Sequence, residues 1–266
     1  MLRWLERLRP RAAAADPMAE ALAAFRAGDH ATALALWEPL ARAGDARAQA
    51  NIGACFAEGL GVARDPALAE RWLQLSAAAG HAAGQRNLAA LYLQGGGDIA
   101  ADPGRAQQLY RAAAEQGDAL AQDMLSWLLL EDDLLPANPG EALRWAIPAA
   151  RAGVAAAMTR IGMLHHHALG VERDVALAAA WWRAGATRGD ADGAAMLGAA
   201  HQLGAGVPRD PALALPWLLR AEAGGSALAQ PFLAAVRAAL TPEAQAAAAA
   251  AARISPAPAP LPETPA

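Results

Sequence analysis

Glycine recurs along this chain at a nearly constant interval, and that interval constrains the fold more than any other feature of the sequence. Six glycines are separated by steps of 36, 37, 36, 36 and 36 residues: Gly44, Gly80, Gly117, Gly153, Gly189 and Gly225. A self-similarity of about 20–50 residues is typical of repeat proteins, whose units stack on their neighbours to bury a continuous core. The spacing therefore predicts a repeat array rather than ordinary globular domains.

A helix start stands upstream of each of these glycines. An Asp or Asn, usually followed by Pro, recurs at Asp65-Pro66, Asp102-Pro103, Asn138-Pro139, Asp174-Val175 and Asp210-Pro211, with a degenerate copy at Asp29-His30. The side-chain oxygen can accept hydrogen bonds from the first-turn N–H groups, and proline at the next position lacks only a donor that would be unpaired anyway. Glycine then ends the helix in the left-handed conformation. Each unit is therefore predicted to be a helix A, a short turn and a helix B.

Small and apolar residues occupy fixed positions after each repeat glycine. The ninth position is small throughout, which would let neighbouring helices approach closely: Gly53, Ala89, Ser126, Gly162, Gly198 and Ala234. The eighth position is apolar, and helix B carries one bulky aromatic per unit, which we expect to act as a packing wedge. The expected core residues are Ile52, Leu88, Leu125, Ile161, Leu197 and Leu233, with Trp37, Trp72, Tyr110, Trp145, Trp181, Trp182 and Trp217.

The run from Gly53 to Gly80, GACFAEGLGVARDPALAERWLQLSAAAG, resembles a unit of the Sel-one-like repeat (SLR) family, a relative of tetratricopeptide repeats. The resemblance recurs in five units over residues 45–226. It implies an all-α fold, a right-handed superhelical α-solenoid of antiparallel helix pairs with a concave groove. It also implies a scaffold or adaptor that binds another protein or peptide.

The remaining chain is divided by its composition. Residues 1–15 form a basic segment, 16–44 a degenerate first helix pair and 227–254 the capping helices that a solenoid requires. Residues 255–266 are rich in Pro and Ala and offer little to bury, so we expect them to be disordered.

If helix A lines the groove, as the resemblance implies, the groove residues should vary between repeats while their neighbours stay fixed. The third, seventh, tenth and fourteenth positions do so, and their spacing places them on one helical face. The candidate partner-binding residues are Arg47, Asn51, Asn87, Met124, Trp127, Glu131, Arg160, Met163, His167 and Met196. Trp127 is the expected anchor. The alternative for Met124 and Met196 is that they fill space between adjacent repeats, as methionine often does.

Composition argues against most other functions. The formal net charge is -4, which lacks the basic footprint of nucleic-acid binding, and all 22 basic residues are arginine. Without lysine, a phosphate-binding loop, a pyridoxal Schiff base and the S-x-x-K acyl enzymes are impossible. The paired cysteines of SLR members credited with β-lactam hydrolysis are absent. We therefore expect no enzyme and no cofactor.

The alternative function is a metal-binding or hydrolytic module that uses the run His165-His166-His167. Consecutive helical residues point about 100° apart, whereas helical metal pairs use i,i+4 spacing. We therefore expect His165 to be a packing residue and the sequence to hold no metal site.

Several features indicate the compartment. Met1 to Arg11 contains no uninterrupted apolar run, and the segment Ala244 to Ala252 is too short to cross a bilayer. The single cysteine, Cys55, cannot form an internal disulfide and aligns with apolar core positions. We expect a cytoplasmic protein without stable membrane insertion.

Overall fold

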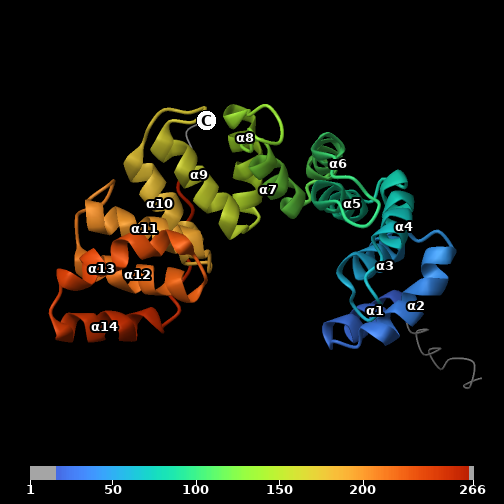
Figure 1. Cartoon of the computed structure of the whole chain (residues 1–266), viewed down its shortest axis with the longest axis horizontal. Helices are drawn as coiled ribbons and strands as arrows, with labels where there is room; N and C mark the ends of the chain where they lie inside the picture. Colours follow the sequence, from blue (N-terminus) through green and yellow to red (C-terminus); the bar gives the residue numbers. More distant parts are fainter. Residues whose placement is uncertain (1–15, 264–266) are drawn as a thin grey trace, which may run out of the picture. The chain divides into compact units, whose positions relative to one another are not determined.

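The computed structural model describes residues 16–263, which fold into helices joined by short loops (Figure 1). Within that range no β-strand forms, and an isolated bridge joins Gly96 to Ile99. The basic segment expected over residues 1–15 lies outside the described residues. The helices are α1 (Pro17–Arg26), α2 (His30–Arg42), α3 (Ala46–Glu58), α4 (Pro66–Ala78), α5 (Ala82–Gln94), α6 (Pro103–Glu115), α7 (Ala119–Leu128), α8 (Pro139–Arg151), α9 (Ala155–His167), α10 (Val175–Ala186), α11 (Ala191–Leu203), α12 (Pro211–Ala223), η2 (Ala227–Ala229), α13 (Gln230–Ala238) and α14 (Pro242–Ala252).

The chain divides into two compact units, residues 1–113 and 114–266, with the division inside α6. Each unit is a stack of antiparallel helix pairs. In unit 1 the contacts run from α1 through α2, α3 and α4 to α5, and α3 also touches α5. In unit 2 they run from α7 through α8, α9, α10 and α11 to α12, and the A helices α7, α9 and α11 touch in sequence. The all-α solenoid class that the sequence predicted is confirmed.

The predicted helix starts and stops are confirmed. At the start of α4 the Asp65 carboxylate accepts the N–H of Leu68 at 2.9 Å, and Asp174 accepts that of Leu177 at 2.8 Å before α10. The six repeat glycines all have positive φ, between +77° and +96°, which a side chain would strain. Capping at both ends therefore fixes where each helix pair turns.

Close approach of the two helices within a pair depends on the small ninth position. A Cβ added to Gly53 would lie 2.6 Å from Cγ of Leu73, and one on Gly198 would lie 2.7 Å from Cγ of Leu218. At Gly162 the added atom would lie 2.5 Å from the indole of Trp182. Glycine at these positions therefore lets the large residue of helix B pack directly on the backbone of helix A.

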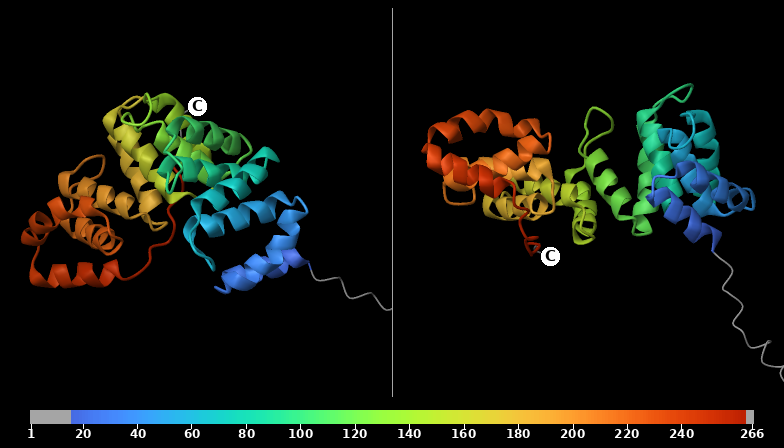
Figure 2. Two further views of the ribbon diagram at one scale, coloured as in Figure 1. Left: turned by 45° about the vertical axis from the view of Figure 1, so that its right-hand side comes forward. Right: turned by 90° about the horizontal axis from the view of Figure 1, so that it is seen from below.

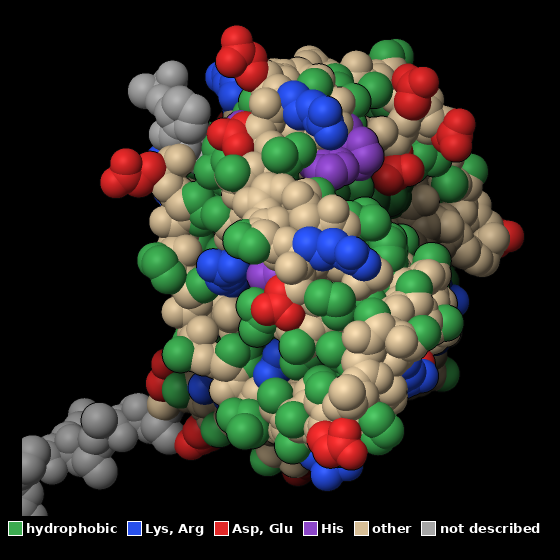
Figure 3. All heavy atoms as spheres, turned by 90° about the vertical axis from the view of Figure 1, so that its left-hand side faces the viewer, with side chains coloured by type: hydrophobic (Ala, Val, Ile, Leu, Met, Phe, Trp, Pro, Cys, Tyr) green, Lys and Arg blue, Asp and Glu red, His purple; other side chains and the backbone are tan. Residues whose placement is uncertain are grey.

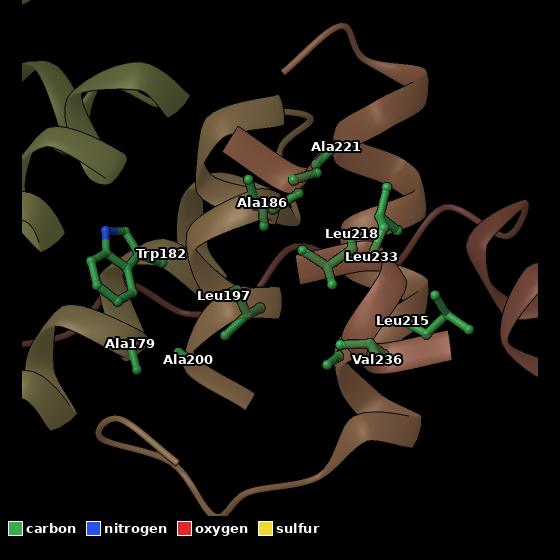
Figure 4. Close-up of a cluster of buried hydrophobic side chains, with 14 of the residues drawn as sticks. Ala179, Trp182, Ala186, Leu197, Ala200, Leu215, Leu218, Ala221, Leu233 and Val236 are labelled. Atoms are coloured by element: carbon green, nitrogen blue, oxygen red, sulfur yellow. The ribbon is translucent and has the colours of Figure 1, made fainter. Parts of the chain in front are cut away.

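Most of the expected core residues are buried, and three of the tryptophans are only partly so. All six residues at the eighth position are buried, as are Trp37, Tyr110, Trp181 and Trp182. Trp72, Trp145 and Trp217 are half-buried. Figure 4 shows the largest described cluster of unit 2, in which Leu197 of α11 and Leu215 and Leu218 of α12 pack with Leu233 and Val236 of α13. The helices after the fifth repeat thus cover the last apolar face.

The expectation of a disordered tail is wrong for residues 255–263. Ala259 is hydrogen-bonded to Thr187 and Arg188 at the end of α10, and Leu261 packs against buried residues of α8, α9 and α10. Composition did not reveal this order because the ordering comes from contacts with distant residues. Figure 2 shows the segment leaving the red helix α14 as an extended coil. Residues 264–266 lie outside the described part of the chain.

Among the described residues, no helix combines the length and the apolar character that crossing a membrane would require.

A stability prediction follows from the glycine of α9. Gly162→Ala should destabilise unit 2 by about 1–3 kcal/mol despite the better helix propensity of alanine, because the new methyl overlaps the Trp182 indole. Urea unfolding followed by circular dichroism measures the change. Gly140→Ala is the matched control, since its Cβ would meet only Asn138 Oδ1 at 4.0 Å. Equal stability of the two variants would contradict this account of the helix contact.

A second prediction concerns the thiol of Cys55, which is 1% exposed. Burial raises its pKa to about 11, so the thiol stays protonated at neutral pH and is a poor nucleophile. Reaction with a disulfide reagent at pH 8 should be slow in the native protein and fast in urea at the same pH. Equal rates in both conditions would show that the thiol is accessible in the folded chain.

Candidate functional site

Five of the predicted partner-binding residues surround one hollow in unit 2. Trp127, Glu131, Arg160, Met163 and Met196 all line a depression of about 540 Å³. Trp127 comes from α7, Arg160 and Met163 from α9, Met196 from α11, and Glu131 from the loop after α7. Because A helices of consecutive repeats touch one another, residues at equivalent positions of the repeat meet along one surface.

The wall of the hollow is mainly apolar and partly open to solvent. Met163 is 40% exposed, and Leu169 and Leu228 beside it are each 42% exposed. Trp127 is half-buried, so part of its ring faces outward. Met196 lines the hollow and also packs against the buried cluster of α10 to α14. Flexible methionines next to a tryptophan form a surface that can adapt to an apolar side chain.

Arg160 is fixed by an ion pair with Asp123 of α7. The two side chains are each 13% exposed, and Arg160 Nη1 also donates to the main-chain oxygen of Asp123 at 3.2 Å. Removal of one partner from such a pair leaves a poorly solvated charge, which is strongly destabilising. Arg160 therefore ties α9 to α7, and its positive charge is neutralised at the edge of the hollow.

The other charged residues around the hollow are acidic. Asp190 Oδ2 accepts the Thr159 hydroxyl at 2.5 Å and the Gly193 N–H at 2.7 Å, which caps α11. Asp192 accepts the hydroxyl of Ser226 at 2.6 Å. Together with Glu131 these carboxylates give the hollow a negative balance, since Asp123 already neutralises Arg160.

Charges of both signs are distributed over the outer surface. On the face drawn in Figure 3, arginine side chains lie apart from one another among acidic and hydrophobic side chains.

Other predicted site residues lie elsewhere. In unit 1, Asn87 lines a small hollow of about 150 Å³ with Glu58, Arg64 and Gln94, whereas Arg47 and Asn51 are not part of its lining. In unit 2, Met124 is half-buried and His167 exposed, and neither lines the larger hollow. Five of the ten predicted residues therefore share one depression, and the binding role of all ten stays a prediction.

Residues outside the middle of helix A complete the hollow, and they were not among the predicted site residues. Leu130 and Leu169 lie in loops, Pro139 begins α8, and Leu228 lies in η2 at the third position after Gly225. Asp123 was also missed, because its partner Arg160 lies 37 residues away. One feature of the sequence could have identified Leu169: it is a large apolar residue in a turn, where the fold does not require a buried side chain.

The histidine run of α9 places its three side chains in different environments. His165 is buried, His167 is exposed, and the ring of His166 lies 5.2 Å from that of Trp182. Burial lowers the pKa of His166, with smaller contributions from His167 and Arg173, so the ring remains neutral to lower pH than usual. Over residues 16–263, no three His, Cys, Asp or Glu side chains are arranged to hold a metal ion.

The solved structures similar to this chain include two repeat proteins. A protective antigen present in uropathogenic Escherichia coli strains, described as displaying an SLR fold, is 28% identical with a TM-score of 0.82. The match covers 89% of this chain and 51% of that protein, so this chain spans about half of its length. A Sel1 repeat protein from Oxalobacter formigenes is 27% identical with a TM-score of 0.77, over 90% of this chain and 98% of that one.

Comparison with curated proteins gives no match. The Sel1 repeat model matches residues 46–81, 82–118, 119–154, 155–190 and 191–226. These ranges follow the helix pairs α3–α4, α5–α6, α7–α8, α9–α10 and α11–α12. Because the five matches together cover more than half of the sequence, this chain belongs to the Sel1 repeat family.

Proposed function

We propose that this protein is an interaction scaffold that holds a segment of another protein in the hollow between α7, α9 and α11. Sel1 repeat proteins are generally protein-interaction scaffolds, and the fold is typically non-enzymatic. The observation that carries the proposal is the open apolar wall of Met163, Leu169 and Leu228 beside Trp127. Exposed apolar surface of this kind marks interaction sites.

The ligand is a peptide segment with one large apolar residue. The hollow of about 540 Å³ is large enough for a leucine, methionine or aromatic side chain with some flanking chain. Trp127 and Met163 would contact that residue, since aromatic anchors in the centre of an interface carry much of the binding energy.

The proposed ligand also carries a basic residue close to its large apolar residue. Glu131, Asp190 and Asp192 line the same hollow, and Asp123 neutralises the arginine among them. An arginine or lysine of the ligand would therefore meet complementary charge, which favours specificity and fast association. Arg47, Asn51 and Asn87 of unit 1 remain proposed contacts for a longer partner.

Selection from a random peptide display library tests the proposal. Peptides enriched on the wild-type protein should carry a large apolar residue and a nearby Arg or Lys. Their affinity should fall by more than about tenfold for Met163→Glu, because the bound apolar residue would lose its contact and would desolvate a carboxylate. Fluorescence anisotropy of the enriched peptides measures this change.

Matched variants separate binding from folding. Met163→Leu keeps the apolar character at a similar volume. Leu213→Ala removes a leucine that is more exposed, at 51% against 40% for Met163, but that lies on α12 outside the hollow. Both should bind the enriched peptides about as well as the wild type. Unchanged affinity for Met163→Glu, or enrichment of acidic peptides, would refute the proposed site.

A further inference from the structure

The segment of residues 255–263, here named the strap, crosses the surface of unit 2 in an extended form. Its start is set by Arg220 of α12, whose Nη2 donates to the main-chain oxygens of Ala251 at 2.6 Å and Ile254 at 2.9 Å. These bonds hold the end of α14 against α12. The strap then runs to the end of α10, which lies more than 70 residues earlier in the sequence.

Two side chains at the end of α10 bind the main chain of Ala259. The Thr187 hydroxyl accepts the Ala259 N–H at 2.9 Å, and Arg188 Nη1 donates to the Ala259 oxygen at 2.8 Å. Both groups are held in place by α10 itself. The Thr187 hydroxyl donates a hydrogen bond to the main-chain oxygen of Arg183 at 2.9 Å, and Arg188 Nη1 donates one to the main-chain oxygen of Ala184 at 3.0 Å. The pair is therefore a preformed clamp for one peptide unit.

An apolar contact follows two residues after the clamped position. Leu261 is half-buried and packs against the cluster of α8, α9 and α10 that contains Ala146, Ile161 and Trp181. Between the two contacts, Pro260 is exposed. Proline at 258 and 260 presets the extended conformation, so little conformational freedom is lost on docking.

The clamp is specific to one repeat. The two residues before the other repeat glycines are Arg42-Ala43, Ala78-Ala79, Glu115-Gln116, Arg151-Ala152 and Ala223-Gly224. A hydroxyl followed by a guanidinium occurs at these positions only in Thr187-Arg188. The general solenoid does not require this pair, which therefore belongs to the site that receives the strap.

We propose that this surface of α8 to α10 is a second binding site, which accepts an extended proline-rich segment of a partner protein and which the strap occupies in the unbound chain. Thr187 and Arg188 bind the main-chain N–H and C=O of one residue, so that residue can be any amino acid except proline. The apolar cluster of α8 to α10 that Leu261 contacts requires an apolar residue two positions later. The ligand is therefore a segment in which prolines flank a non-proline residue and a leucine follows, as in Pro258-Ala259-Pro260-Leu261.

The strap would act as a built-in competitor at this site. It is held by two main-chain hydrogen bonds and one leucine, and its tether gives it a high effective concentration. A partner segment with additional contacts outside the clamp would displace it. This site takes an extended backbone, and it is separate from the hollow that would take an apolar anchor.

The test uses the full chain and a fluorescein-labelled peptide of the sequence SPAPAPLPE, which is that of residues 255–263. The variant Ala259→Pro with Leu261→Ala should release the strap, because it removes the clamped N–H and the apolar side chain. This released variant should bind the peptide at least about tenfold more tightly than the wild type does, since the tethered strap no longer competes. Anisotropy titration measures both affinities.

Two controls test whether the peptide binds at Thr187 and at the apolar cluster that Leu261 contacts. Adding Thr187→Val to the released variant removes the acceptor at nearly constant volume and should weaken binding about three- to tenfold. A peptide with Ala in place of the leucine should also bind more weakly. Equal binding to the wild type and the released variant, or no binding to either, would overturn the proposal and leave the strap a purely structural element.

Amide exchange tests the same contact without destabilising the chain. The Ala259 amide should exchange slowly in the wild type and faster in Thr187→Val, with α10 otherwise unchanged. Exchange of the Ala259 amide at the rate of an unstructured peptide in the wild type would also overturn the proposal, because the clamp would then be unoccupied.

Discussion

The close contact between the two helices of a repeat is the constraint on which the rest of the structure depends. Where helix A has glycine at the ninth position, a bulky residue of helix B rests on its backbone: Leu73 on Gly53, Trp182 on Gly162 and Leu218 on Gly198. A methyl group at any of these glycines would overlap that residue. Because interiors are packed to nearly crystalline density, such contacts set the spacing within each pair.

This packing leaves one face of the A helices outside the core. The eighth position faces the core and is always apolar, whereas the seventh and tenth positions vary between repeats and supply Arg160, Met196, Trp127 and Met163 around the hollow. Asp190 both stabilises the fold and lines the hollow. Its carboxylate caps α11 and accepts a hydrogen bond from the Thr159 hydroxyl. The residues around the hollow are therefore supported by groups that also determine where helices begin.

Unit 2 presents two chemically different surfaces. The hollow offers apolar side chains with acidic neighbours and suits a side-chain anchor. The clamp of Thr187 and Arg188 offers hydrogen bonds to main-chain groups and suits an extended backbone with few side-chain requirements. A scaffold with both surfaces could hold two segments at once, and the strap would make access to one of them depend on competition within the chain.

The sequence alone determined the repeat period, the helix ends and the core columns, because caps, turn glycines and packing positions are local or recur every repeat. It also identified the helix face that carries Trp127, Met163 and Met196. Only the tertiary structure decided that Leu169 completes the hollow, that Asp123 neutralises Arg160 and that residues 255–263 are ordered. These features join residues more than 30 positions apart through contacts that do not repeat, so no periodicity in the sequence could reveal them.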